Sequence, residues 1–188
     1  MHGEQKMIEN KAYIYIDNKY HKEAIELLKL IFKEKKEIIK ENNLLKLIVN
    51  NCDGFSLILK NFLKNQLSEM ISCSILIVPS FDKRFEKYIH YKKDNVSAIF
   101  DIFLDYLNDD IIKDAHEIVK EVGKKNIDTI EAFIDCNMNV LKTSELLYLH
   151  RNSLNYRLNQ FSLKTGYDIR DINTIMFLKI VINISKNK

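Results

Sequence analysis

Hydrophobic residues recur mostly at a helical spacing in the first third of this chain. Between residues 20 and 41, apolar side chains fall three and four positions apart, with lysine and glutamate between them. The apolar positions are Ala24, Leu27, Leu28, Ile31 and Phe32. This pattern predicts an amphipathic helix. Residues 42–70 predict more helix, interrupted near Asp53 and Gly54.

Two short segments favour strands instead. KAYIYI, residues 11–16, alternates and is rich in Tyr and Ile. ISCSILIVP, residues 71–79, is an apolar run that ends at Pro79. Runs of this kind are typical of strands, although the second is also compatible with a buried helix. The N-terminal region is therefore expected to be helical, with at most a small β element.

Helical spacing returns in the second half of the chain. Residues 94–110 and 110–123 predict two amphipathic helices, and Gly123 suits the end of the second. The next three residues, KKN, predict a linker. The fold class expected for the whole chain is mainly α, because Gly and Pro are scarce and helical spacing dominates.

Four more helices are expected after residue 126. IDTIEAFIDCN carries isoleucines on one face, and the next helix begins after Asn139, a good N-cap. A third helix follows over HRNSLNYRLNQFSLKTG and ends near Gly166, and a fourth spans residues 171–186. Two of these helices meet at a tight connection, Tyr148-Leu149-His150, which predicts a helix-turn-helix.

The third of these helices has an unusual polar face. On a helical wheel, Leu154, Leu158 and Phe161 form one apolar stripe. The opposite side carries amides and a phenol: Asn152, Asn155, Tyr156 and Asn159. Amides can pair with base edges in the DNA major groove, and arginines at the margins can reach phosphates. The pattern favours a DNA-reading helix.

Charge supports this interpretation, because it is concentrated in one segment. Residues 142–164 hold four cations, Lys142, Arg151, Arg157 and Lys164, against one acid, Glu145. The net charge of the segment therefore equals that of the whole chain, +3. An anionic partner would be met by this local patch rather than by a basic tail.

Residues 139–171, NVLKTSELLYLHRNSLNYRLNQFSLKTGYDIRD, resemble a known family. They are similar to the C-terminal helix-turn-helix of PucR/CdaR-type bacterial transcription regulators, whose signature reads approximately HRNTLxYRL and then TGxDLRD. Direct matches are His150, Arg151, Asn152, Leu154, Tyr156, Arg157 and Leu158. Ser153 stands in place of Thr, and Ile169 in place of Leu. The resemblance covers residues 127–185.

The same segment is similar, more loosely, to the Fis-type helix-turn-helix. A glycine often occupies the turn position that Tyr148 holds here. A left-handed backbone at a tyrosine would be strained, so this position tests the comparison. His150 is expected to be a cap or turn residue rather than a base reader.

The PucR-type resemblance implies a transcription regulator that binds double-stranded DNA. By position, base-edge contacts are assigned to Asn152, Ser153, Asn155 and Tyr156. Contacts to the DNA backbone are assigned to Thr143, Arg151, Arg157 and Lys164. Covering the end of the helix is an alternative role for Tyr156. The division expected is an N-terminal regulatory or dimerisation region, residues 1–123, and a DNA-binding domain, residues 124–188.

The composition of the chain limits the kinds of partner and of chemistry that can be expected. The three cysteines are isolated, which suits a reducing cytoplasm and predicts no zinc site. No apolar run is long enough for a membrane span or a signal peptide. We expect a homodimer, because one small helix-turn-helix has little interface for specific binding. A small-molecule or protein effector of unknown identity is also expected, with no cofactor and no metal.

Enzyme chemistry finds little support in the sequence. The titratable clusters are His21 with Glu23, His90 with Tyr91, and Asp114 with His116 and Glu117. None has the spacing of metal ligands, and all are interpreted as residues of solvated helix faces. No catalytic residue is therefore assigned. A second class stays open beside the regulator: a non-enzymatic helical protein-interaction adaptor with a vestigial helix-turn-helix.

Overall fold

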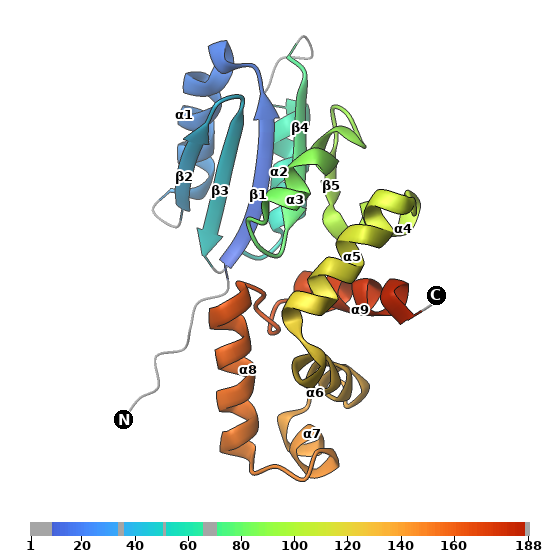
Figure 1. Ribbon diagram of the computed structural model, residues 1–188. Coiled ribbons are helices and arrows are strands. Elements are labelled where there is room, and N and C mark those ends of the chain that lie inside the picture. The colour runs from blue at the N-terminus through green and yellow to red at the C-terminus, as the bar shows by residue number, and fades with distance from the viewer. Residues whose placement is uncertain (1–8, 34–35, 51, 66–70, 187–188) are drawn as a thin grey trace. The chain divides into compact units, whose positions relative to one another are not determined.

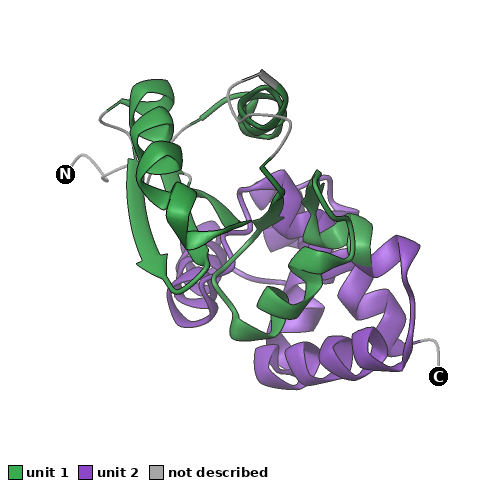
Figure 2. Cartoon of the chain, turned by 90° about the horizontal axis from the view of Figure 1, so that it is seen from above, with its two compact units in different colours: residues 1–102 green, residues 103–188 purple. Residues whose placement is uncertain are grey.

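The computed structural model describes residues 9–33, 36–50, 52–65 and 71–186. The chain splits into two compact units, residues 1–102 and residues 103–188, coloured green and purple in Figure 2. The division lies within helix α4 (Ile99–Asp105). The expected functional division after residue 123 is a separate matter and stays a prediction.

Unit 1 is built on a five-stranded sheet in the order β2-β3-β1-β4-β5. Its strands are β1 (Glu9–Ile16), β2 (Lys36–Glu41), β3 (Leu44–Asn50), β4 (Cys73–Val78) and β5 (Val96–Ala98). Strand β1 is antiparallel to both of its neighbours, and β5 runs parallel to β4 (Figure 1). With two helices, the first four strands follow the βαββαβ order of ferredoxin-like folds.

Helices α1 (His21–Phe32) and α2 (Phe55–Asn65) cover one face of this sheet (Figure 1). Alternate residues of β1, such as Ile14, are buried there against Leu28 of α1 and Leu59 of α2. Each fully buried side chain of this size contributes about 1.5–3 kcal/mol. The short helices η1 (Asn18–Tyr20), α3 (Lys83–Glu86) and η2 (Lys87–His90) complete the unit.

The helical interpretation of residues 36–50 is wrong, because β2 and β3 form an antiparallel hairpin there. The helix expected over 20–41 ends at Phe32. The hairpin turns at Asn42, whose φ is +50°, a conformation that asparagine tolerates better than most residues. The expected N-terminal region therefore carries a substantial sheet rather than a small β element, although the chain as a whole is mainly helical.

The two strands expected from the sequence are confirmed as β1 and β4. Two other expectations need correction. The expected helix over 94–110 contains strand β5 followed by the short helix α4. The expected linker KKN is the first turn of a helix that begins at Lys124. Of the regions expected to be helical, residues 34–35, 51 and 66–70 lie outside the described residues.

Unit 2 is helical. After the end of α4 it contains α5 (Asp109–Val122), α6 (Lys124–Asp135), α7 (Val140–Leu146), α8 (Arg151–Thr165) and α9 (Ile172–Lys186). The expected helix ends at Gly123 and Gly166 are confirmed. Four aromatic rings lie in series at its core: Phe161, Tyr167, Phe177 and Phe103, with neighbouring centroids 6.5, 6.0 and 5.3 Å apart. Within the described ranges, no helix is both long and apolar enough to cross a membrane.

Two of the three titratable clusters are less solvated than expected, whereas His90 of the third is exposed. His21 is buried, and its Nε2 lies 3.1 Å from the carbonyl oxygen of Ile16. Asp114 is also buried, and Nδ1 of His116 donates to the carbonyl of Ile112 at 2.6 Å. Among the described residues, no group of three or more His, Cys, Asp or Glu is placed to hold a metal ion.

Candidate nucleic-acid interface

The connection between α7 and α8 is a tight turn closed by two backbone hydrogen bonds. The N–H of Leu149 donates to the carbonyl of Ser144 at 2.8 Å, and that of Tyr148 to Glu145 at 3.1 Å. This pair of bonds is the Schellman motif, which needs a left-handed residue after the helix. Tyr148 supplies it with a φ of +53°. Tyr148 therefore has the strained, left-handed backbone that the Fis-type comparison required at this position.

The connection between α6 and α7 is built in the same way. The N–H of Met138 donates to the carbonyl of Phe133 at 2.8 Å, and the φ of Asn137 is +54°. Asn139 then caps α7, since its side chain accepts from the N–H of Lys142 at 3.0 Å. The N-cap expected at Asn139 is confirmed. Both connections thus fix the directions of α7 and α8 through local backbone bonding.

Helix α8 begins at a histidine cap. Nδ1 of His150 accepts a hydrogen bond from the N–H of Asn152 at 3.2 Å. His150 therefore holds the first turn of α8, as the sequence suggested. The apolar stripe is also confirmed, because Leu154, Leu158 and Phe161 are all buried in unit 2. The side of α8 opposite this stripe is left to solvent.

That exposed side carries most of the predicted DNA contacts. The predicted contact residues that are exposed are Arg151, Asn152, Ser153, Asn155, Tyr156 and Lys164. The side chain of Tyr156 is 67% exposed, which does not fit a role in covering the helix end. The surface offers amide, hydroxyl and phenol groups with cations at its margins. Such a surface can form hydrogen bonds to base edges and ion pairs with phosphates.

The structure contradicts the contact predicted for Thr143. This residue is 0% exposed, and its hydroxyl donates to the carbonyl of Asn139 at 2.8 Å. The side chain therefore has no access to a phosphate. Ser144, beside it, is also buried, and the two small residues lie on the inner face of α7. Small buried side chains at these two positions allow another helix to pack closely against α7.

Arg157 is half-buried and joins α8 to α6. Its Nη1 donates to the hydroxyl of Thr129 at 3.1 Å, and that hydroxyl donates to the carbonyl of Lys125 at 2.9 Å. The guanidinium is therefore held in one orientation. It lies at the edge of the exposed side of α8 rather than free in solvent.

A groove of about 630 Å³ opens beside α8, and it includes residues that the sequence did not point to. Lys125 and Asn126 line it from α6, and Gln160 lines it from α8. Lys125 was missed because KKN was interpreted as a linker. A signal was available, since two lysines at a helix start are unusual next to the positive end of the helix dipole.

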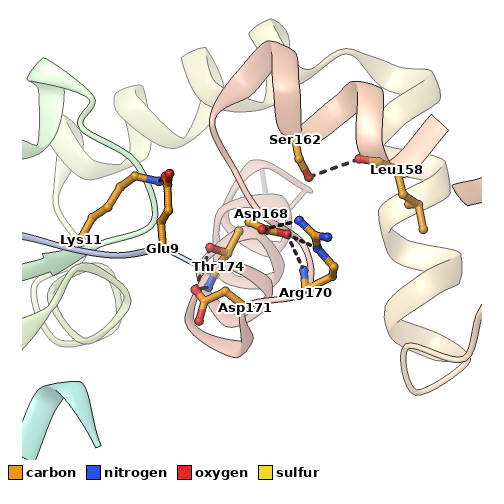
Figure 3. Close-up of polar contacts among 8 residues, drawn as sticks. All are labelled: Glu9, Lys11, Leu158, Ser162, Asp168, Arg170, Asp171 and Thr174. Carbon is orange, nitrogen blue, oxygen red and sulfur yellow. Dashed lines mark hydrogen bonds and ion pairs between the residues drawn. The ribbon is translucent and has the colours of Figure 1, made fainter. Parts of the chain in front are cut away.

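The segment that matches TGxDLRD has a structural role. Arg170 donates to both carboxylate oxygens of Asp168, at 2.8 and 2.7 Å (Figure 3). This ion pair raises the pKa of Arg170. The carboxylate of Asp171 accepts from the N–H and the hydroxyl of Thr174, at 2.8 and 2.9 Å, and so caps α9 (Figure 3). The motif joins α8 to α9.

Helices α7 and α8 form a helix-turn-helix that α6 precedes, and its second helix, α8, presents a polar, cationic face. Residues 127–184 match the family model of the PucR C-terminal helix-turn-helix domain. The C-terminal part of this chain is therefore a PucR-type helix-turn-helix domain. The resemblance found from HRNSLNYRL is confirmed.

Three relatives share parts of the sequence. The carbohydrate diacid regulator of Escherichia coli (strain K12) is 33% identical over 60 residues, 32% of this chain and 16% of that protein. The DNA-binding transcriptional activator AdeR of Bacillus subtilis (strain 168) is 40% identical over 47 residues, 25% of this chain and 11% of that protein. Uncharacterized protein YxkF of the same organism is 50% identical over 42 residues, 22% of this chain and 14% of that protein. The matches thus span less than a fifth of each relative.

Proposed function

We propose that this protein is a sequence-specific DNA-binding transcription regulator that reads the major groove with α8. The observation that carries the proposal is the division of α8 into two sides. Leu154, Leu158 and Phe161 are buried, while Asn152 and Asn155 face solvent beside cations. An ordinary solvated helix face would mix Glu and Lys instead. The helix-turn-helix match and the regulators among the relatives support the same function.

The proposed contacts follow the exposed side. Asn152, Ser153, Asn155 and Tyr156 contact base edges, because residues in the first turns of a recognition helix reach deepest into the groove. Arg151, Arg157 and Lys164 contact phosphates. Thr143 is omitted because it is buried.

We further propose that the protein acts as a homodimer. Residues 124–188 would bind DNA, and residues 1–123 would serve regulation or dimerisation in response to an effector. A single small module buries about 600–1,000 Å² on DNA, which limits specific affinity, and a second copy doubles that area. Two-fold symmetry would then match two half-sites in the operator.

The test is capture of genomic DNA. The full chain is incubated with sheared DNA from its source organism, and the retained fragments are sequenced. We expect the fragments to share a sequence, and their affinity to fall steeply as salt rises, since phosphate contacts release counterions. Retention without a shared sequence would contradict specific reading. If no DNA is retained and association with a protein is insensitive to salt, the chain is the adaptor instead.

A further inference from the structure

The groove beside α8 has the charge expected of an anion site. Lys125 of α6 lies on one side of it, and Arg157 and Lys164 of α8 line the other. Among the described residues that line it, none is an acid. The remaining polar groups include the amides of Asn126 and Gln160, which can donate hydrogen bonds. The groove, about 630 Å³ in volume, is open to solvent rather than enclosed, so an extended chain of phosphates can enter it.

The groove is also continuous with the surface that would meet the bases. Asn152 and Tyr156, two of the proposed base-contacting residues, line it as well. Residues 152, 156, 160 and 164 follow each other at intervals of four, so they form one row along α8. A DNA strand bordering the major groove that receives α8 must run alongside this helix.

We propose that the sugar-phosphate backbone of one DNA strand passes through this groove, with phosphates held by Lys125, Arg157 and Lys164. The inference rests on the proposed function and adds its docking geometry. The new contact is Lys125, which belongs to the helix that precedes the helix-turn-helix pair. A phosphate bound by Lys125 would set how the domain is rotated about the axis of α8. With α6 held against the DNA backbone, one side of α8 faces the bases.

Thr129 is a positioning residue in this arrangement. Its hydroxyl accepts from Arg157 and donates to the carbonyl of Lys125, so it holds the guanidinium at the groove and ties it to the chain that carries Lys125. A guanidinium that is already oriented loses less side-chain entropy when it binds a phosphate. Thr129 itself is buried and makes no DNA contact.

The first test compares two lysines of one helical turn. Lys124 and Lys125 are both exposed at the start of α6, but only Lys125 lines the groove. Binding of the full chain to a fluorescent mixed-sequence duplex of about 30 base pairs, roughly three helical turns, is titrated across a series of salt concentrations. Lys125→Gln should lower the slope of log affinity against log salt by about one, which is roughly eight-fold in affinity at ~0.1 M salt. Lys124→Gln should leave the slope nearly unchanged.

The second test separates positioning from charge. Thr129→Val removes the hydroxyl at nearly the same volume, and Thr129→Ser keeps it. Thr129→Val should weaken binding roughly three- to ten-fold at every salt concentration, because Arg157 keeps its charge but loses its fixed orientation. The salt slope should stay unchanged, and Thr129→Ser should restore most of the affinity. A melting curve verifies that each variant is folded under the assay conditions.

The outcomes distinguish the two proposals. If the unsubstituted chain does not bind the duplex, the proposed function fails. If it binds and Lys125→Gln behaves like Lys124→Gln, the groove is not the phosphate site, although the regulator function stands. Equal affinities for folded Thr129→Val and Thr129→Ser would overturn the positioning role. Loss of slope in both lysine variants would indicate general attraction rather than a defined contact.

Discussion

Tyr148 adopts a left-handed backbone conformation without any compensating burial. Its φ is +53°, yet its side chain is 97% exposed. A side chain with a Cβ in this conformation costs about 1–2 kcal/mol, which is why glycine usually holds such positions. The turn between α7 and α8 is therefore less stable than the same hydrogen-bonded turn would be with glycine at position 148. An exposed tyrosine kept at that cost fits a contact with the partner of α8.

The first prediction follows from this strain. Tyr148→Gly should raise the free energy of unfolding of unit 2 by about 1 kcal/mol, because the Cβ clash is removed and no packing is lost. Tyr148→Ala is the control, since alanine keeps the Cβ and should give no gain. Urea denaturation followed by circular dichroism measures both. Equal stabilisation by the two variants would place the strain in the tyrosine ring rather than in the backbone.

At the scale of single elements, sequence spacing predicted the helices of unit 2 better than the strands of unit 1. Helices α5 and α7–α9 have caps and stops that can be read directly, such as Asn139, Gly123 and Gly166. In KEIIKENNLLKLIVNN, by contrast, paired apolar residues match both helix and strand spacing. The turn is made by asparagines, so neither Gly nor Pro marks it. Pairing with β1, which is distant in sequence, decides the outcome.

The candidate site was predictable only where it depends on the spacing of residues within one helix. The two sides of α8 followed from its own period, and the structure agrees with them. The inner face of α7, which buries Thr143, and the approach of Lys125 to Gln160 depend on how three helices pack. The spacing of residues within one helix does not indicate how that helix packs against the others. Spacing within one helix therefore predicted the exposed side of α8, but not the groove beside it.

The second prediction concerns the orientation of α8. Asn155→Ala should reduce discrimination between the preferred duplex and its single-base variants by about 1–3 kcal/mol, because one bidentate amide-base pair is lost. Binding to mixed-sequence DNA should change little. Asn159→Ala makes the same change one helical turn further from the start of α8, where no base contact is proposed. Selection of duplexes from a random library, followed by titrations, measures both. Greater loss of discrimination in Asn159→Ala would mean that α8 enters the groove by its C-terminal half.

At the scale of the whole molecule, unit 2 offers a second surface that α8 does not use. A groove of about 450 Å³ lies between the α4–α5 segment and α9, lined mainly by apolar side chains. Leu104 and Leu107 at its edge are 59% and 58% exposed. The lining residues come from positions 103–112 and 180–184 of the chain. The homodimer proposed above would cover these side chains.

The third prediction tests that dimer. Leu107→Glu should convert the full chain from dimer to monomer, because a carboxylate in an apolar interface is costly to bury. Leu57→Glu is the matched control, since Leu57 is 63% exposed on α2 in unit 1, outside the groove. Light scattering at about tens of micromolar gives the mass of each variant. A monomeric unsubstituted chain, or a dimer that survives Leu107→Glu, would exclude this interface.

The hydrogen bond between Arg157 and Thr129 also limits which substitutions can be accepted at these two positions during evolution. Losing the hydroxyl alone leaves a half-buried guanidinium without this acceptor, and losing the arginine alone leaves a buried hydroxyl with only its bond to the carbonyl of Lys125. Each single substitution is therefore more harmful than it would be after the other has occurred. Among descendants of this sequence, an acceptor at position 129 should persist as long as arginine persists at 157. The two positions should be replaced together, although 28 residues separate them in the chain.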